Sequence, residues 1–269
     1  MIPVRAGIPR RTPIVAWMLI GLNVAVWIYM VYRGGGFYDY VIERYGLTPA
    51  YIVEGKALYT IVTSMFIHGD VMHLIGNMLY LGVFGGPIES RIGHRRFLIL
   101  YMASGIFASI AHTLVEVYLA EPIILYGWMG MKIVDPKYIP SIGASGAISG
   151  ILGAYLVLLP ASSVRIVTMI GWIPVVISIP AALFIAGWFL YQLYAGILSV
   201  TIPQLYFSGV AFWAHIGGFI AGLAMGLALK PRRIPAVIFD YRSRYLNTAP
   251  PGASMIFPYP KHGYLQFNP

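Results

Sequence analysis

The chain has 269 residues, of which 59% are hydrophobic and 10% are charged. A soluble domain carries roughly 25% charged residues, so this composition excludes an ordinary soluble protein and indicates a membrane protein with several spanning segments. The formal net charge is +9, but the basic residues lie between and beyond the apolar segments, a distribution that argues against a nucleic-acid partner. The chain has no cysteine, which excludes disulfides, a thiol nucleophile and a cysteine-ligated metal.

Apolar segments predict six membrane helices, and therefore an all-α fold built as a polytopic six-transmembrane-helix bundle. The predicted helices cover residues 13–32, 71–87, 97–119, 145–159, 181–200 and 208–229. Residues 13–229 are expected to form one membrane domain. Residues 1–12 are expected to be a basic N-terminus, and the proline-rich residues 230–269 a poorly ordered C-terminal tail.

The connections between these helices differ in length and polarity. Residues 37–69 form a long connection in which we expect short interfacial helices, because long structureless loops are uncommon. Residues 89–96 predict a tight basic loop, and residues 120–142 a second long loop. Residues 164–179 are apolar and β-branched but are broken by Pro174, so they predict an interfacial connection rather than a span.

Lysine and arginine residues predict the orientation of the chain in the membrane. They cluster in the N-terminus, in the 89–96 loop and in the C-terminal tail, whereas the 37–69 and 120–142 loops mix both signs. By the positive-inside rule, both termini are expected in the cytoplasm of a protein that crosses the cell membrane several times. The second, fourth and sixth helices then run inward, so their N-terminal ends share the outer face.

The fourth predicted helix begins at a serine between small residues, in the sequence Gly143-Ala144-Ser145-Gly146. At about 1.5 Å per residue, residues 145–159 cover roughly 22 Å of a hydrocarbon core that is about 30 Å thick. Ser145 is therefore expected below the outer surface. Small residues are common where membrane helices pack closely, but a polar group in hydrocarbon is costly and suggests a function.

Other polar residues are expected at the same depth. His68, His73 and Asn77 begin the second helix, where His73 and Asn77 lie one turn apart on the same face. His215 lies near the start of the sixth helix. Since these helices and the fourth all run inward, we expect the side chains of His73, Asn77 and His215 to meet Ser145 near the outer face.

Glycines favour close approach of the fourth and sixth helices. They recur along both helices, at Gly146, Gly150 and Gly153 and at Gly218, Gly222 and Gly226. Such small-residue stripes let helix backbones approach closely, which a direct serine–histidine contact requires. In most membrane proteins, however, a stripe of this kind serves packing alone.

This set of residues suits nucleophilic catalysis. A serine hydroxyl needs a neighbouring base, and neutral histidine is the usual one. The oxyanion then needs fixed donors, for which the Ser145 amide, the Asn77 side chain and the His73 imidazole are available. No acid lies within the spans to complete a triad, so the pair would act as a dyad.

Two other readings of the histidines stay open at this point. Embedded histidines often make only an interhelical hydrogen bond, and His73 with Asn77 would suit a helix clasp. His68, His73 and His215 together suggest zinc, but no carboxylate or cysteine completes a metal shell at their depth. We therefore expect neither a metal nor a cofactor.

The chain resembles the rhomboid intramembrane serine proteases of the basic six-helix form, over residues 40–229. The matching pieces are the Gly143–Gly146 motif, the His68, His73 and Asn77 spacing, Ala214-His215-Ile216-Gly217-Gly218 with Gly222, Thr63-Ser64-Met65-Phe66-Ile67-His68, and Glu89, Gly93, Arg96 and Phe97. The resemblance implies a nucleophile at Ser145, a general base at His215 and an oxyanion site of Asn77, His73 and the Ser145 amide. Gly143, Gly146, His68, Gly218 and Gly222 support the motifs.

The resemblance also implies a substrate class. Such proteins cut transmembrane protein substrates near the outer membrane face through an acyl-enzyme, with the first long loop partly in the membrane and a gate near the fifth helix. Two positions depart from the family pattern, because Tyr59-Thr60 replaces Trp-Arg and Ser149 replaces an aromatic residue that stacks on the histidine. The second departure leaves open what orients His215.

Two alternatives from other classes remain. One is an inactive rhomboid-like protein that binds or escorts membrane helices, although such relatives typically lack the serine or the histidine and this chain has both. The other is a channel or transporter, but the sequence shows neither the inverted repeat nor the paired broken helices of many transporters.

Overall fold

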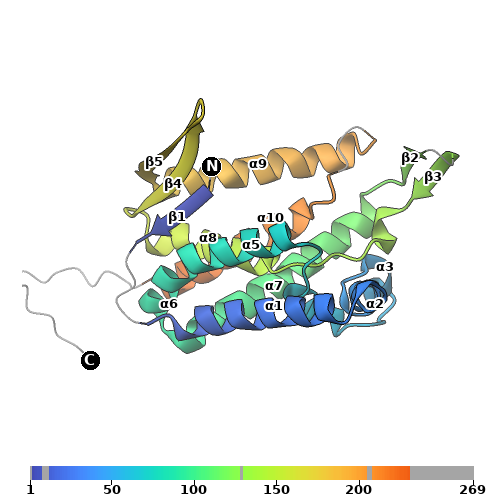
Figure 1. The fold of residues 1–269 in the computed structure, drawn as a ribbon, viewed down its shortest axis with the longest axis horizontal. Coiled ribbons are helices and arrows are strands. Elements are labelled where there is room, and N and C mark those ends of the chain that lie inside the picture. Colours follow the sequence, from blue (N-terminus) through green and yellow to red (C-terminus); the bar gives the residue numbers. More distant parts are fainter. Residues whose placement is uncertain (1, 8–11, 128–129, 205–207, 231–269) are drawn as a thin grey trace, which may run out of the picture. The chain divides into compact units, whose positions relative to one another are not determined.

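The computed structural model describes residues 2–7, 12–127, 130–204 and 208–230. Five helical segments in it are long and apolar enough to cross a bilayer, and α8 (Ser145–Leu158) is a shorter apolar helix of 14 residues. The five are α1 (Ile14–Tyr32), the continuous segment α5 (Val71–Tyr80), η2 (Leu81–Gly85) and α6 (Gly86–Ile92), then α7 (His94–Tyr118), α9 (Ala181–Thr201) and α10 (Phe212–Leu229). The predicted helical membrane architecture is confirmed (Figure 1). The expected C-terminal tail lies outside the described residues from 231 onward.

The expected basic loop at residues 89–96 is wrong. Instead α6 continues to Ile92, and a single left-handed residue, Gly93 with φ of 84°, joins it to α7. Within this stretch Glu89 is buried, and its carboxylate accepts hydrogen bonds of 2.8 Å from the backbone N–H groups of Val15 and Ala16. These groups begin α1, which has no side-chain cap of its own, so an anion at this helix start satisfies them.

The long connections contain more regular structure than expected. Residues 37–69 hold short helices, as predicted: most of α2 (Gly35–Tyr45), then α3 (Pro49–Val53), α4 (Thr60–Thr63) and the 3-10 turn η1 (Ser64–Phe66). Residues 120–142 were expected to be a loop, but they carry an antiparallel hairpin of β2 (Ile123–Gly127) and β3 (Gly130–Val134), followed by η3 (Pro136–Tyr138).

A small sheet lies at the opposite end of the helices from β2 and β3 (Figure 1). The apolar connection at 164–179 forms no span, as expected, but folds into the hairpin β4 (Ser163–Ile170) and β5 (Ile173–Pro180). The N-terminal strand β1 (Ile2–Ala6) pairs with β4, giving the order β1-β4-β5. Alternation explains the hairpin, because Val164 and Ile166 are buried while Arg165 between them is exposed.

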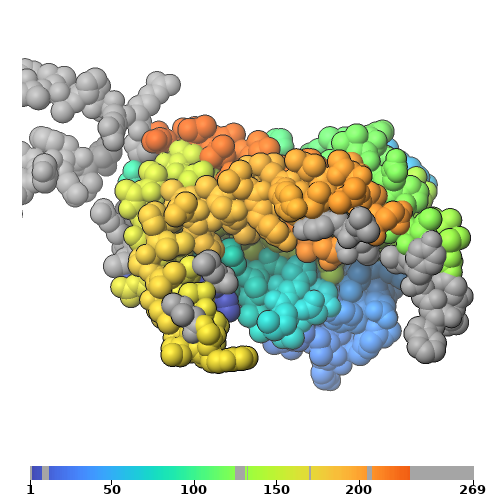
Figure 2. Space-filling view, turned by 90° about the horizontal axis from the view of Figure 1, so that it is seen from above, coloured from blue at the N-terminus to red at the C-terminus, as the bar shows by residue number. Residues whose placement is uncertain are grey.

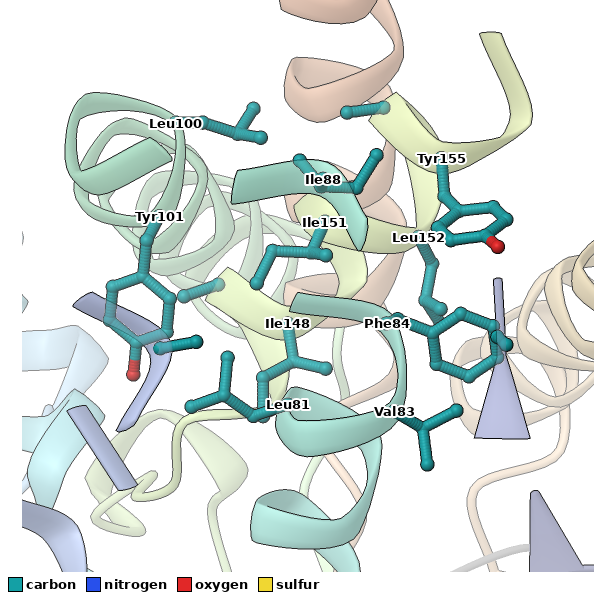
Figure 3. Close-up of a cluster of buried hydrophobic side chains, with 14 of the residues drawn as sticks. Leu81, Val83, Phe84, Ile88, Leu100, Tyr101, Ile148, Ile151, Leu152 and Tyr155 are labelled. Atoms are coloured by element: carbon teal, nitrogen blue, oxygen red, sulfur yellow. The ribbon is translucent and has the colours of Figure 1, made fainter. Parts of the chain in front are cut away.

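Helix α8 lies at the centre of the packing. Its most extensive contact is with α10, and α7 and η2 also pack against it. The residues Ile151, Leu152 and Tyr155 of α8 interlock with Phe84 of η2 and Tyr101 of α7 (Figure 3), and all five are fully buried. In lipid, such close packing replaces the hydrophobic effect as the force that holds helices together.

The glycine stripes meet face to face, as the sequence predicted. A Cβ atom added at Gly222 would overlap the backbone of Gly150, and one added at Gly218 would overlap the carbonyl of Gly146. A side-chain carbon added at Gly218 or Gly222 would therefore force α8 and α10 apart. The absence of side chains at these positions sets the distance between the two helices.

We predict that Gly222→Val lowers the melting temperature of the purified protein, since overpacking of this kind costs about 1–3 kcal/mol. Gly21→Val is the matched control, because a Cβ atom added at Gly21 in α1 has no neighbour within 4 Å. Thermal unfolding in one detergent compares the two variants. Equal melting temperatures would contradict the account of the α8–α10 contact.

Candidate active site

Ser145 and His215 lie in direct contact. Ser145 is the first residue of α8 and His215 lies in the first turn of α10. The distance between the serine Oγ and the imidazole Nε2 is 2.8 Å, which is a hydrogen bond. The contact follows from the glycine pairing just described, because Gly146 and Gly218 bring the two helix starts together.

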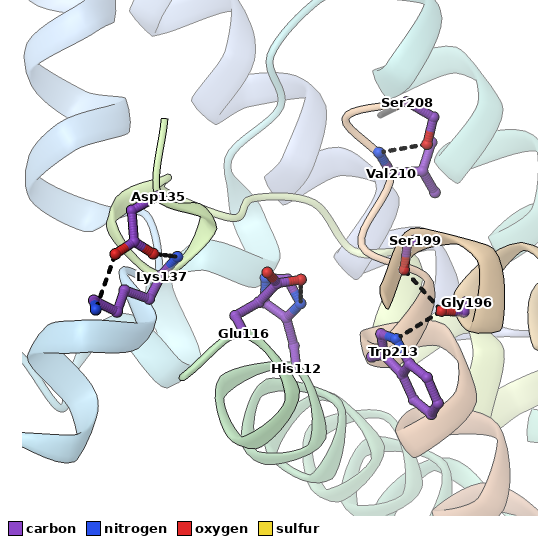
Figure 4. Close-up of polar contacts among 9 residues, drawn as sticks. All are labelled: His112, Glu116, Asp135, Lys137, Gly196, Ser199, Ser208, Val210 and Trp213. Carbon is purple, nitrogen blue, oxygen red and sulfur yellow. Dashed lines mark hydrogen bonds and ion pairs between the residues drawn. The ribbon is translucent and has the colours of Figure 1, made fainter. Parts of the chain in front are cut away.

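A cavity of about 660 Å³ opens onto this pair. Ser145, His215 and His73 line it, together with His112 and Glu116 of α7, whose side chains approach each other to 3.5 Å (Figure 4). A second pocket of about 30 Å³ lies behind Ser145 beside Gly105 and Ala108. That volume is enough for one water beside the hydroxyl.

The residues expected to hold an oxyanion lie against the backbone that precedes Ser145. Gly143 has φ of 118°, and a Cβ atom there would come within 2.6 Å of His73 Nε2 and 3.7 Å of Asn77 Nδ2. Asn77 is buried and its amide donates to the His73 carbonyl at 3.1 Å. The described lining of the large cavity includes His73 but not Asn77, which lies one turn deeper on α5.

His68 supports His73 from behind. Its side chain is fully buried, and the centroids of the two imidazole rings are 5.1 Å apart in an edge-on arrangement. Burial, together with the neighbouring His73, lowers the pKa of His68 to about 4, so its ring is neutral at neutral pH. Among the described residues, no group of three or more histidine, cysteine or acidic side chains is arranged to hold a metal ion.

Two residues of α9 contact His215, and neither was expected from the sequence. Gln192 is buried, and its Oε1 lies 2.7 Å from the imidazole Nδ1. Trp188, one turn earlier, places its ring 5.9 Å from the His215 ring at an angle of 37°. Ser149 does not reach the histidine but donates to the Ser145 carbonyl at 2.6 Å. A lone amide in an apolar span was the signal that could have identified Gln192.

The fold and the site define a class of protein, namely a polytopic helical membrane protein with a serine–histidine pair at the start of a short central helix. A family model described as "Rhomboid domain" matches residues 55–232. The chain therefore belongs to the rhomboid family.

Three relatives illustrate the similarity. RHOMBOID-like protein 12, mitochondrial, of Arabidopsis thaliana is 31% identical over 65% of this chain and 48% of its own length. RHOMBOID-like protein 4 of the same plant is 31% identical over 70% of this chain and 38% of its own length. Rhomboid protease GluP of Bacillus subtilis is 26% identical over 81% of this chain and 35% of its own length. The chain thus spans between about a third and a half of the length of these relatives.

Proposed function

We propose that the chain is an intramembrane serine endopeptidase that cleaves transmembrane protein substrates near the outer membrane face. The observation that carries this proposal is the 2.8 Å contact between Ser145 Oγ and His215 Nε2 at a cavity large enough for a peptide segment. Membership of the rhomboid family and the similarity to a relative named a rhomboid protease support it.

The chemistry runs through an acyl-enzyme. His215 Nε2 takes the hydroxyl proton of Ser145 as Oγ attacks the scissile carbonyl carbon, and a tetrahedral oxyanion forms. When this intermediate collapses, the peptide C–N bond breaks and His215 returns the proton to the leaving amine. A water then gives one proton to His215 and attacks the ester carbonyl, which releases the acid product and restores the Ser145 hydroxyl.

The oxyanion needs donors that are already in place. The backbone N–H of Ser145 begins α8 and has no carbonyl one turn earlier in the helix to bind. The Asn77 amide and the His73 imidazole lie beside Gly143, close to this N–H group. We assign these three groups to the oxyanion site, where they are worth more than in water because the surroundings are poor in solvent.

The site favours substrates that unwind. The carbonyl groups of a membrane helix are already hydrogen-bonded, so a scissile carbonyl becomes available only where the substrate helix opens. Glycine, proline and β-branched residues near the outer boundary weaken a helix. Small residues next to the scissile bond fit a nucleophile that is enclosed by close helix packing.

Charge and strand pairing support the orientation that we propose. Strand β1 precedes α1 and strand β4 follows α8, and their pairing brings the N-terminus to the same side of the membrane as the far end of α8. Arg5 and Arg165 lie opposite each other in this pair. We therefore assign this side to the cytoplasm, the Ser145 end of α8 to the outside, and both termini to the cytoplasm of a cell-membrane protein.

A catalytically inactive helix-binding protein is the alternative. It would retain the fold without needing a serine hydroxyl beside an imidazole. The hydrogen bond between Ser145 and His215 favours the protease, because a pure binding function requires no such pair.

We predict that Ser145→Ala and His215→Ala each abolish cleavage of a model transmembrane substrate by the purified protein in liposomes, because neither half of the dyad acts alone. Ser162→Ala is the control, since Ser162 lies beyond the opposite end of α8. It should cleave like the wild-type protein. Substantial cleavage by either dyad variant, with melting temperature unchanged, would refute the assignment.

We predict that Asn77→Ala lowers kcat by about 10- to 1000-fold, the range for one lost oxyanion donor. The matched control is Asn23→Ala, because Asn23 is also buried and its amide makes the same bond to the carbonyl four residues earlier, at 2.8 Å. It should affect stability but not kcat. His73→Ala should act like Asn77→Ala, and unchanged turnover in both would remove them from the site.

The cysteine-free sequence allows a direct test of orientation. We predict that a membrane-impermeant maleimide modifies Lys56→Cys on intact cells but modifies Lys230→Cys only after permeabilisation. Both lysines are exposed in the structure. The reverse pattern would overturn the proposed cytoplasmic location of the termini.

A further inference from the structure

The orientation of His215 sets a requirement on its second ring nitrogen. A neutral imidazole carries one proton, so Nε2 can accept the Ser145 hydroxyl proton only when the ring proton is on Nδ1. The described contacts of Nδ1 include no residue of α8, and the Ser149 hydroxyl is directed to the Ser145 carbonyl of its own helix. A group on another helix must therefore fix the tautomer.

Gln192 meets this requirement, and we infer that it is the positioning residue of the proposed protease, accepting the Nδ1–H of His215 through its amide oxygen. The Oε1–Nδ1 distance is 2.7 Å, and only 4% of Gln192 is exposed. This inference rests on the proposed function. It adds Gln192 to the Ser145–His215 dyad as a third residue that orients the imidazole and transfers no proton.

The surroundings hold Gln192 in place. One turn earlier, Trp188 packs against the His215 ring. One turn later, the Gly196 carbonyl accepts a hydrogen bond of 3.1 Å from Trp213 Nε1 of α10 (Figure 4). A Cβ atom at Gly196 would come within 3.0 Å of Ile216, so the glycine allows α9 to lie close to α10 at this point. Three successive turns of α9 thus contact the start of α10.

An amide suits this position better than a carboxylate. Helix α9 is the outer helix on its face of the protein (Figure 2) and carries no charged residue. A buried carboxylate would be expensive there unless it were paired with a charge, whereas a neutral amide oxygen accepts the same proton without that cost. The hydrogen bond that the amide oxygen makes is weaker than the one a carboxylate would make.

The variant Gln192→Met tests this role, because it keeps the length of the side chain and removes the acceptor. The described lining of the cavity does not include Gln192, so we expect KM to stay unchanged. We expect kcat to fall about 10- to 100-fold, which is more than the loss of one hydrogen bond and less than the loss caused by a fully wrong tautomer. Gln192→Glu keeps an acceptor oxygen of the same shape at the cost just described, so it should lower the melting temperature but keep a higher kcat than Gln192→Met.

Thr201→Val is the matched control on α9. Among the described residues its hydroxyl bonds only the carbonyl of Ile197 in its own helix, at 2.9 Å, so its loss should leave kcat unchanged. Wild-type kcat in Gln192→Met, or equal losses of kcat in Gln192→Met and Thr201→Val, would overturn the inference. A loss in Gln192→Glu as large as in Gln192→Met would do the same.

A spectroscopic measurement separates this inference from the proposed function. In protein labelled with ¹⁵N-histidine, the ring signals of His215, identified by their loss in His215→Ala, should show a proton on Nδ1 in the wild type and a second tautomer in Gln192→Met. The same tautomer in both proteins would refute the role of Gln192 even if Ser145 is essential. The expected spectra with full cleavage by Ser145→Ala would instead refute the protease and leave the contact intact.

Discussion

The backbone contact between α8 and α10 is the interaction on which the site depends. The backbone of Gly150 faces Gly222, and that of Gly146 faces Gly218, so α10 has no room for a Cβ atom at position 218 or 222. Two helices that carried ordinary side chains here would stand farther apart, and the hydroxyl of Ser145 could not reach His215 at 2.8 Å. The contact between the Ser145 hydroxyl and the His215 imidazole is therefore a product of helix packing rather than of a loop conformation.

A lipid environment explains the other features of the site. Helix α8, with 14 residues, covers only about 21 Å of a hydrocarbon core about 30 Å thick, and the cavity reaches Ser145 at its first residue. Around His215 the structure uses an amide, an indole and a hydroxyl, and none of these carries a charge. Neutral partners limit the cost of placing polar groups in a low-dielectric region.

Much of this arrangement could be predicted from the sequence. The spans, the glycine stripes and the histidines at the helix starts follow from composition and periodicity, because these features are local or repeat along one helix. The β4–β5 hairpin was missed because its strand character depends on burial of Val164 and Ile166 against other elements. The 89–96 segment was misjudged because Glu89 acts as a cap for α1, more than seventy residues earlier in the chain.

Gln192 was missed for a related reason. A single glutamine in an apolar helix indicates a polar contact but does not say with which residue, and only the fold shows that its amide reaches His215. The departure at Ser149 was visible in the sequence, but its consequence was not. In this chain the aromatic ring beside His215 belongs to Trp188 of α9, and a contact between two helices leaves no local pattern in the sequence.

The central claim is that Ser145 is a nucleophile activated by His215, and the most direct measurement is the site of a covalent adduct. After reaction of the purified protein with a fluorophosphonate, peptide mapping by mass spectrometry identifies the modified residue. The account predicts one adduct, on Ser145. Modification of Ser149, Ser199 or Ser208 instead, or no adduct on a folded protein, would contradict it.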